Sequence, residues 1–165
     1  MRLINRKDIE DWAKSFDSKG HLPILISKLV RATTPKSTFA EFPSGSSVFV
    51  EGWDGIVKCT EQTAYVGEGV SLWEFGTEKN NKKKADSDYS KRTSDPLAQN
   101  PSECIFVFAT PNFWRDKEKW RLEKLKDKVW KDIRVYDSRN LEEWLDIAPY
   151  VSRWFSVFVN KYPSD

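Results

Sequence analysis

Two strand patterns with a helical pattern between them occupy residues 104–136. Cys104–Ala109 is a continuous apolar run, which is typical of a strand that is buried on both faces. Thr110-Pro111 ends this run, an amphipathic helix is expected over residues 115–129, and Ile133–Tyr136 alternates like a short strand. A β-α-β unit of this kind joins parallel strands through a right-handed crossover. The sequence therefore predicts an α/β fold.

The other segments place further helices and strands around this unit. Gly20-His21-Leu22-Pro23 opens a helix with Pro23 in its first turn, and its apolar residues at helical spacing predict a buried stripe of Leu22, Leu25, Ile26, Leu29 and Val30. Further helices are expected over 5–16, 81–93 and 138–148 and from Pro149 to Phe158, and strands over Ser47–Glu51, Ile56–Cys59 and Val70–Phe75. This order of elements predicts a mixed central sheet that is flanked by helices.

Composition narrows the class of protein. With 165 residues, 32% charged and 39% hydrophobic, residues 1–165 are expected to form one globular domain. Because no apolar run approaches the ~20 residues that span a bilayer and no signal-peptide pattern is present, we expect a cytoplasmic protein without membrane partners. One histidine and two cysteines without a CxxC pair argue against a structural zinc site. The sequence also has no Gly-rich phosphate-binding motif of the P-loop or dinucleotide type.

Two acidic residues stand close to neighbouring strands. Asp54 lies in a Trp-Asp-Gly turn, where Gly52 and Gly55 allow close approach of a ligand, and Glu74 lies near the end of the strand Val70–Phe75. Carboxylate oxygens are the ligands that Mg²⁺ and Mn²⁺ prefer, and an inward-facing charge needs a partner. Two structural alternatives stay open: Asp54 as an Asx-turn residue, and Glu74 in a salt bridge to a lysine of the next helix.

The motifs around these residues resemble those of the PD-(D/E)xK, or restriction-endonuclease-like, nuclease superfamily. The series Gly-Trp-Asp-Gly, Ser-Leu-Trp-Glu-Phe-Gly, Lys-Ala-Asp-Ser-Asp-Tyr-Ser-Lys-Arg, Phe-Val-Phe-Ala-Thr-Pro and Val-Tyr-Asp-Ser-Arg-Asn-Leu-Glu-Glu-Trp-Leu is similar to the N-terminal nuclease-like modules of bacterial antiphage-defence proteins. In those proteins a signalling ATPase and a sensor follow the module. The resemblance implies a restriction-endonuclease-like core, metal-dependent cleavage of DNA with RNA not excluded, and a homo-oligomer or an associated ATPase-sensor module.

The resemblance also implies roles for individual residues. Asp54 and Glu74 would bind the metal, with the Phe75 carbonyl as a further ligand. The chain departs from the superfamily motif at Gly76, where the motif has a lysine. The catalytic lysine would then come from the following helix, with Lys84 as the first candidate and Lys82 or Lys83 behind it.

The helix over residues 81–93 is locally basic, although the net charge of the chain is only +2. Lys84, Asp88 and Lys91 are expected to share one face of this helix, next to a face with Ala85, Tyr89 and Arg92. Lys82, Lys83, Lys91 and Arg92 are the candidates for contacts with phosphates, which would hold nucleic acid without reading its sequence. An ordinary i,i+4 charge ladder on a solvated helix explains the same pattern.

Two interpretations of function follow from these residues. The first is a Mg²⁺-dependent endodeoxyribonuclease with Asp54, Glu74 and Lys84 as its catalytic residues. The second is a catalytically inactive module that keeps the nuclease fold for nucleic-acid binding or protein assembly, and Gly76 favours it. Glu41 and Glu51 are possible auxiliary acids. Phe113, Trp114 and Arg115 follow the strand Cys104–Ala109, and they either bind a ligand by stacking and phosphate contacts or pack.

Overall fold

A computed structural model describes residues 2–43 and 52–161 and contains a five-stranded mixed sheet. The strands lie in the order β1 (Phe39–Glu41), β2 (Gly55–Cys59), β3 (Gly69–Phe75), β4 (Cys104–Ala109) and β5 (Asp132–Tyr136). The β1–β2 and β2–β3 pairs are antiparallel, and the β3–β4 and β4–β5 pairs are parallel. The predicted α/β class with a mixed, helix-flanked sheet is therefore confirmed.

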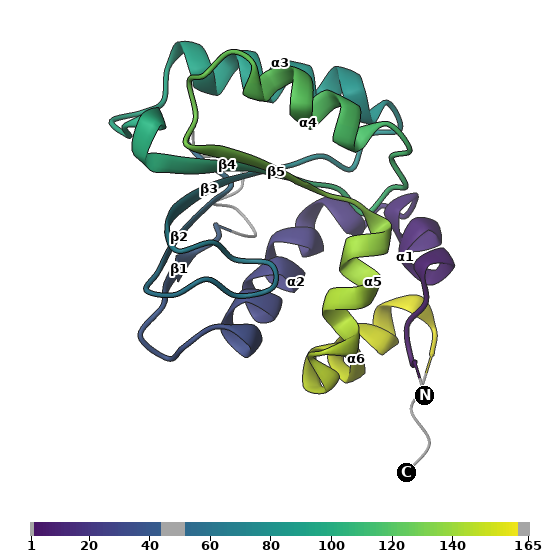
Figure 1. Cartoon of the computed structure of the whole chain (residues 1–165). Helices are drawn as coiled ribbons and strands as arrows, with labels where there is room; N and C mark the ends of the chain where they lie inside the picture. Colours follow the sequence, from purple (N-terminus) through teal and green to yellow (C-terminus); the bar gives the residue numbers. More distant parts are fainter. Residues whose placement is uncertain (1, 44–51, 162–165) are drawn as a thin grey trace.

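Helices cover both faces of the sheet (Figure 1). On one face lie α3 (Asn81–Ser94) and α4 (Lys117–Leu125), and on the other lie α1 (Arg6–Ala13), α2 (Ser18–Thr33), α5 (Ser138–Asp146) and α6 (Pro149–Ser156). Short 3-10 helices, η2 (Pro101–Glu103) and η3 (Val157–Val159), precede β4 and follow α6. Among the described residues, no helix has the length and apolar character needed to cross a membrane.

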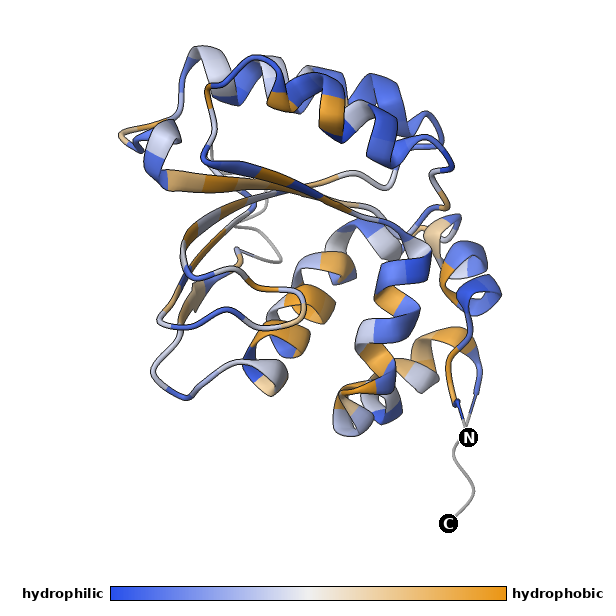
Figure 2. Cartoon of the chain, viewed as in Figure 1, coloured by the Kyte–Doolittle hydropathy of each residue, from blue (hydrophilic) through white to orange (hydrophobic). Residues whose placement is uncertain are grey.

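Each face of the sheet has its own hydrophobic core, because successive strand residues point to opposite faces. Along β4, Ile105 and Val107 pack toward α1, α2, α5 and α6, while Phe106 and Phe108 pack toward α3 and α4. All six residues of β4 are buried, as predicted for a strand with both faces covered. Apolar residues concentrate on the strands and on the helix sides that face them (Figure 2).

The N-terminal half differs in detail from the sequence-based expectation. The predicted strand Ser47–Glu51 lies outside the described residues. The unpredicted strand β1 pairs with β2 on the side away from β3. The second helix begins at Ser18, so that Pro23 lies inside it rather than in its first turn. The predicted stripe is nevertheless correct, because Leu22, Leu25, Ile26, Leu29 and Val30 are all fully buried.

Candidate functional site

Asp54 and Glu74 meet where β2 begins and β3 ends. Gly55 pairs with Trp73, so the antiparallel register brings Asp54, one residue earlier, opposite Glu74. The Oδ2 atom of Asp54 accepts a hydrogen bond of 2.8 Å from the backbone amide of Phe75. The two carboxyl groups are near enough for the charge of Asp54 to raise the pKa of Glu74. The sequence-based prediction that these acids are neighbours on adjacent strands is consistent with this geometry.

Glu74 is a buried acid on the α3 side of the sheet, with 3% of its surface exposed. The Nε atom of Arg92, on α3, donates to its Oε1. Arg92 also donates from Nη2 to the carbonyl of Gly52, and its guanidinium lies 5.2 Å from the centre of the Trp53 ring. The structural alternative for Glu74 thus holds in a modified form: an ion-pair partner does come from the next helix, but it is an arginine.

Burial governs the protonation of Glu74. Removal from water raises the pKa of this carboxyl to about 9, and the hydrogen bond and negative charge of Asp54 add to the rise. Arg92 opposes the rise by donating to the carboxylate. In the absence of a cation, the raised pKa favours the protonated form of Glu74 at neutral pH.

Lys84, in the first half of α3, lines the same pocket as Asp54. Its Nζ lies 3.0 Å from Oδ1 of Asp88, one turn further along the helix. Burial lowers the pKa of Lys84, but the hydrogen bond and charge of Asp88, helped by the charges of Glu78 and Asp54, outweigh this and raise it. The second oxygen of Asp88, Oδ2, is buried without a hydrogen-bond partner. Lys84 is therefore a charged ammonium that faces carboxylates.

Position 76 has no room for a side chain. A Cβ atom on Gly76 would lie 2.6 Å from Cζ of Phe108 and 2.8 Å from Cγ of Lys84. Phe108 is fully buried in the core under α3 and α4, so it cannot move aside cheaply. The stem of Lys84 thus fills space beside β3 that a side chain at position 76 would enter, and its ammonium pairs with Asp88 at the pocket that Asp54 also lines.

A small pocket opens the site to solvent. Its volume is about 230 Å³, and its lining residues include Asp54, Phe75 and Lys84, together with Lys19, Pro23, Thr77 and Glu78. Glu74 is not part of this lining; it is buried opposite Asp54 in the strand register. A ligand in the pocket would therefore meet Asp54 and Lys84 first.

The remaining predicted residues are divided between the surface and the interior. Lys82, Lys83 and Lys91 are exposed on α3, and Lys82 forms an i,i+4 ion pair with Asp86. Arg92 is buried, because it packs against Trp53 and holds Glu74. The prediction that Arg92 is a surface contact for phosphates is therefore wrong.

Lys91 does not share a face with Lys84 and Asp88 as expected. Lys84, Asp88 and Arg92 form the inward stripe at i, i+4 and i+8, and Lys91 points outward. Of the auxiliary acids, Glu41 is exposed at the end of β1, and Glu51 lies outside the described residues.

The carboxyl groups fit a divalent cation in part. Asp54 and Glu74 lie opposite each other in the strand register, and a cation bound by both would replace the proton on Glu74. No cluster of three or more His, Cys, Asp or Glu suited to holding a metal occurs in residues 2–43 and 52–161. Further ligands would have to be backbone oxygens such as the Phe75 carbonyl, or water, as is usual for Mg²⁺.

Comparison of the chain with known proteins gives no match to a family model, a curated protein or a solved structure. The account of the site therefore rests on the residues and geometry of this chain.

Proposed function

We propose that this chain is a metal-dependent nuclease domain that hydrolyses phosphodiester bonds of DNA, with Mg²⁺ or Mn²⁺ as its cofactor. The observation that supports the proposal most directly is that Asp54, at the start of β2, and Lys84, on α3, line one pocket, with Glu74 opposite Asp54 in the strand register. Two carboxyl groups and an ammonium group are the minimum that this chemistry needs. The motif resemblance is the support for an effector role in bacterial antiphage defence.

Each residue has a distinct task in this proposal. A bound Mg²⁺ would polarise the phosphoryl group and neutralise part of its charge. Asp54 and Glu74 would hold the cation, which would replace the proton on Glu74. Lys84, kept charged by Asp88, orients the attacking water or stabilises the negative charge that develops on the phosphoryl oxygens. Arg92 fixes the Glu74 carboxyl in place from behind.

One observation favours the inactive-module alternative. Arg92 already donates a buried hydrogen bond to Glu74, so that the carboxyl has a structural partner without any metal. In this interpretation the pair locks α3 to β3, and the chain binds nucleic acid or another protein without cleaving it.

Cleavage assays separate the two functions. The purified protein is incubated with plasmid DNA and with a labelled oligonucleotide in Mg²⁺, in Mn²⁺ and in EDTA. We expect metal-dependent cleavage that Asp54→Asn and Glu74→Gln abolish, because each variant removes a charged ligand while keeping the shape of the side chain. Glu61→Gln, at an exposed carboxyl between β2 and β3, is the matched control and should cleave normally.

The outcomes are distinct. Cleavage that survives in Asp54→Asn and Glu74→Gln would show that the site lies elsewhere. Absence of cleavage by the unchanged protein, with no binding of Mn²⁺ in a titration, would favour the inactive module.

A further inference from the structure

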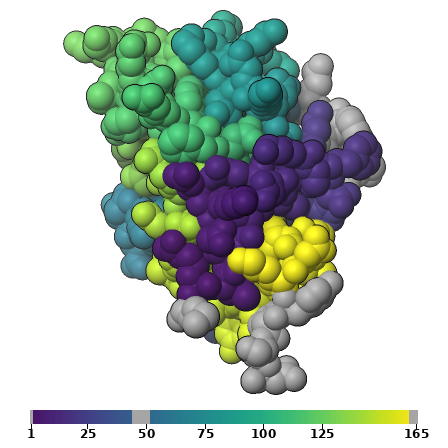
Figure 3. Space-filling view, turned by 90° about the vertical axis from the view of Figure 1, so that its right-hand side faces the viewer, coloured from purple at the N-terminus to yellow at the C-terminus, as the bar shows by residue number. Residues whose placement is uncertain are grey.

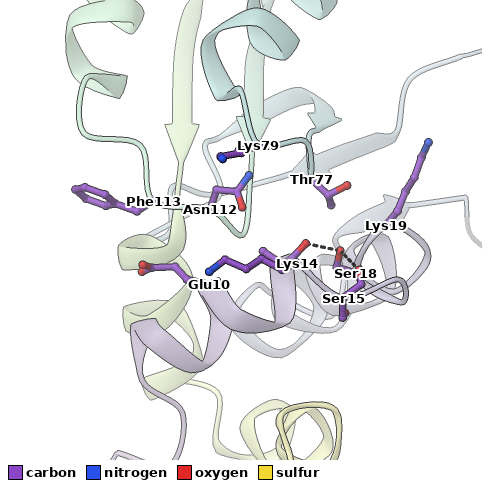
Figure 4. Close-up of a pocket in the computed structure, with 10 residues that line it drawn as sticks. Glu10, Lys14, Ser15, Ser18, Lys19, Thr77, Lys79, Asn112 and Phe113 are labelled. Atoms are coloured by element: carbon purple, nitrogen blue, oxygen red, sulfur yellow. Dashed lines mark hydrogen bonds between the residues drawn. The ribbon is translucent and has the colours of Figure 1, made fainter.

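A second and larger depression adjoins the acidic site. Its volume is about 650 Å³, within the ~300–1,000 Å³ range of ligand sites, and it shares Lys19 and Thr77 with the pocket of Asp54 and Lys84. One wall is the end of α1 and the start of α2, and the other is formed by the β3–α3 and β4–α4 loops (Figure 4). We call it the α1–loop groove, lined by Glu10, Ala13, Lys14, Ser15, Ser18, Lys19, Thr77, Lys79, Asn112 and Phe113.

Hydrogen bonds hold both walls of the groove in place. Ser18 Oγ donates to the carbonyls of Ala13 and Ser15, which closes the turn between α1 and α2. On the other wall, Asn112 Nδ2 donates to the Glu78 carbonyl at 2.7 Å, which ties the β4–α4 loop to the β3–α3 loop. The groove is thus a preformed feature of the fold, and a ligand pays little to order it.

The charge of the groove is positive. Lys14, Lys19 and Lys79 come from both walls, and within the part of the chain that the structure describes none of them forms a salt bridge. The acidic residue of the lining, Glu10, is neutralised by Arg6 at 2.9 Å and accepts a hydrogen bond from Ser138. Three lysines that form no salt bridge with any described residue therefore line this groove.

An aromatic platform lies at one end of the groove. The ring of Phe113 is 38% exposed, and the guanidinium groups of Arg6 and Arg139 lie 4.8 Å and 5.0 Å from its centre. Aromatic rings and guanidinium planes stack with any nucleobase, and lysines along a groove contact phosphates. This combination is typical of binding sites for single-stranded nucleic acid. A duplex is instead read by an element that protrudes into one of its grooves.

We propose that the α1–loop groove binds a single nucleic-acid strand, with its phosphates on Lys14, Lys19 and Lys79 and a base on the Phe113 platform, and leads it to Asp54. This inference deepens the proposed nuclease function and rests on it for the direction of the strand. It places the substrate over the α1–α2 turn rather than along the lysines of α3. Figure 3 faces this side of the molecule, where the surface of α1 borders the surface of the segments above it.

Binding without cleavage tests this proposal independently of catalysis. Fluorescence anisotropy is measured with a labelled single-stranded DNA of about 15 nucleotides in EDTA, using the Asp54→Asn protein, over a range of salt concentrations. We expect K14A/K19A/K79A to bind at least tenfold more weakly. The slope of log K against log salt should become smaller by about 2, since each lysine contact to a single strand contributes about 0.7. Phe113→Ala should weaken binding without changing that slope.

K36A/K119A/K126A is the matched control, since it removes three exposed lysines that lie outside the groove and outside α3. It should leave affinity within about twofold. An equal loss of affinity in both triple variants would contradict the groove proposal, and so would the absence of measurable binding by the Asp54→Asn protein. So would binding of a duplex of the same length that is tighter than that of the single strand. If the protein binds single strands through the groove but never cleaves DNA, the nuclease proposal is rejected and the groove proposal is retained. If K14A/K19A/K79A cleaves DNA normally, the groove proposal is rejected and the nuclease proposal is retained.

Discussion

Replacement of Glu74 by glutamine is predicted to stabilise the protein at neutral pH. Glutamine has the shape of a protonated glutamate, and its amide can donate to Asp54 while its oxygen accepts from Arg92. The contacts that the structure gives Glu74 are therefore kept in the variant. The change removes the cost of keeping a proton on an acid whose pKa is far below neutral in the unfolded chain.

The size of this cost follows from the pKa. The folded state holds the pKa of Glu74 at about 9, against an ordinary value of 4.5, so between these two values the folded state binds more protons than the unfolded state. Stability is therefore lost as the pH rises through this window, by about 1.4 kcal/mol per pH unit. The cost is absent below pH 4.5 and reaches about 3 kcal/mol at pH 7.

Urea unfolding of the unchanged protein and of Glu74→Gln at pH 5, 6, 7 and 8, without divalent metal, measures the difference. We expect the two proteins to differ by less than about 1 kcal/mol at pH 5, with the variant about 3 kcal/mol more stable at pH 7. Glu61→Gln, the exposed control, should show no such trend. If Glu74→Gln is instead several kcal/mol less stable at pH 7, Glu74 is an ionised partner of Arg92 and the argument fails.

Three other predictions concern the same site. Because Glu74 must lose its proton to bind a cation, Mn²⁺ binding at pH 7 should release about one proton. Calorimetry in buffers of different ionisation enthalpy measures this release. Release of no proton would contradict the raised pKa of Glu74. Asp88→Asn removes the charge that raises the pKa of Lys84, so the alkaline limb of the pH–rate profile should move to lower pH. If Asp88 has only a structural role, the variant will be slower but the alkaline limb will not move. Gly76→Ala should cost about 1–3 kcal/mol in a denaturant titration, because its Cβ would overlap Phe108, and a neutral result would show that position 76 has room.

The sheet and its helices could be predicted because their signals are local. The continuous apolar run Cys104–Ala109 indicates a strand that is buried on both faces. The apolar residues from Leu22 to Val30 lie on one face only if the segment is a helix. β1 was not predictable, because its three residues include an exposed Phe39 and only one buried residue, Ala40. Its pairing with β2 makes it part of the sheet, and strand pairing cannot be predicted from the residues of one segment alone.

The site could be predicted in part. Asp54 and Glu74 were recognisable as acids beside glycines and apolar strand residues, which is a local pattern. The partner of Glu74 could not be recognised from the sequence, because α3 carries several basic residues. A small difference in the rotation of the helix determines whether Lys91 or Arg92 points toward Glu74. The groove lysines depend on tertiary structure, since Lys14 and Lys79 meet across one depression although they lie far apart along the chain.

Single-turnover cleavage by Lys84→Ala, compared with Lys82→Ala, tests the central claim that Lys84 serves the acidic pair. Both lysines lie on α3 and form i,i+4 ion pairs, Lys84 with Asp88 at 3.0 Å and Lys82 with Asp86 at 2.7 Å, but only Lys84 lines the pocket of Asp54. We predict that Lys84→Ala lowers the Mg²⁺-dependent rate by about 10²–10³ while Mn²⁺ affinity is retained, and that Lys82→Ala changes the rate by less than about threefold. Equal rates for the two variants would contradict the account.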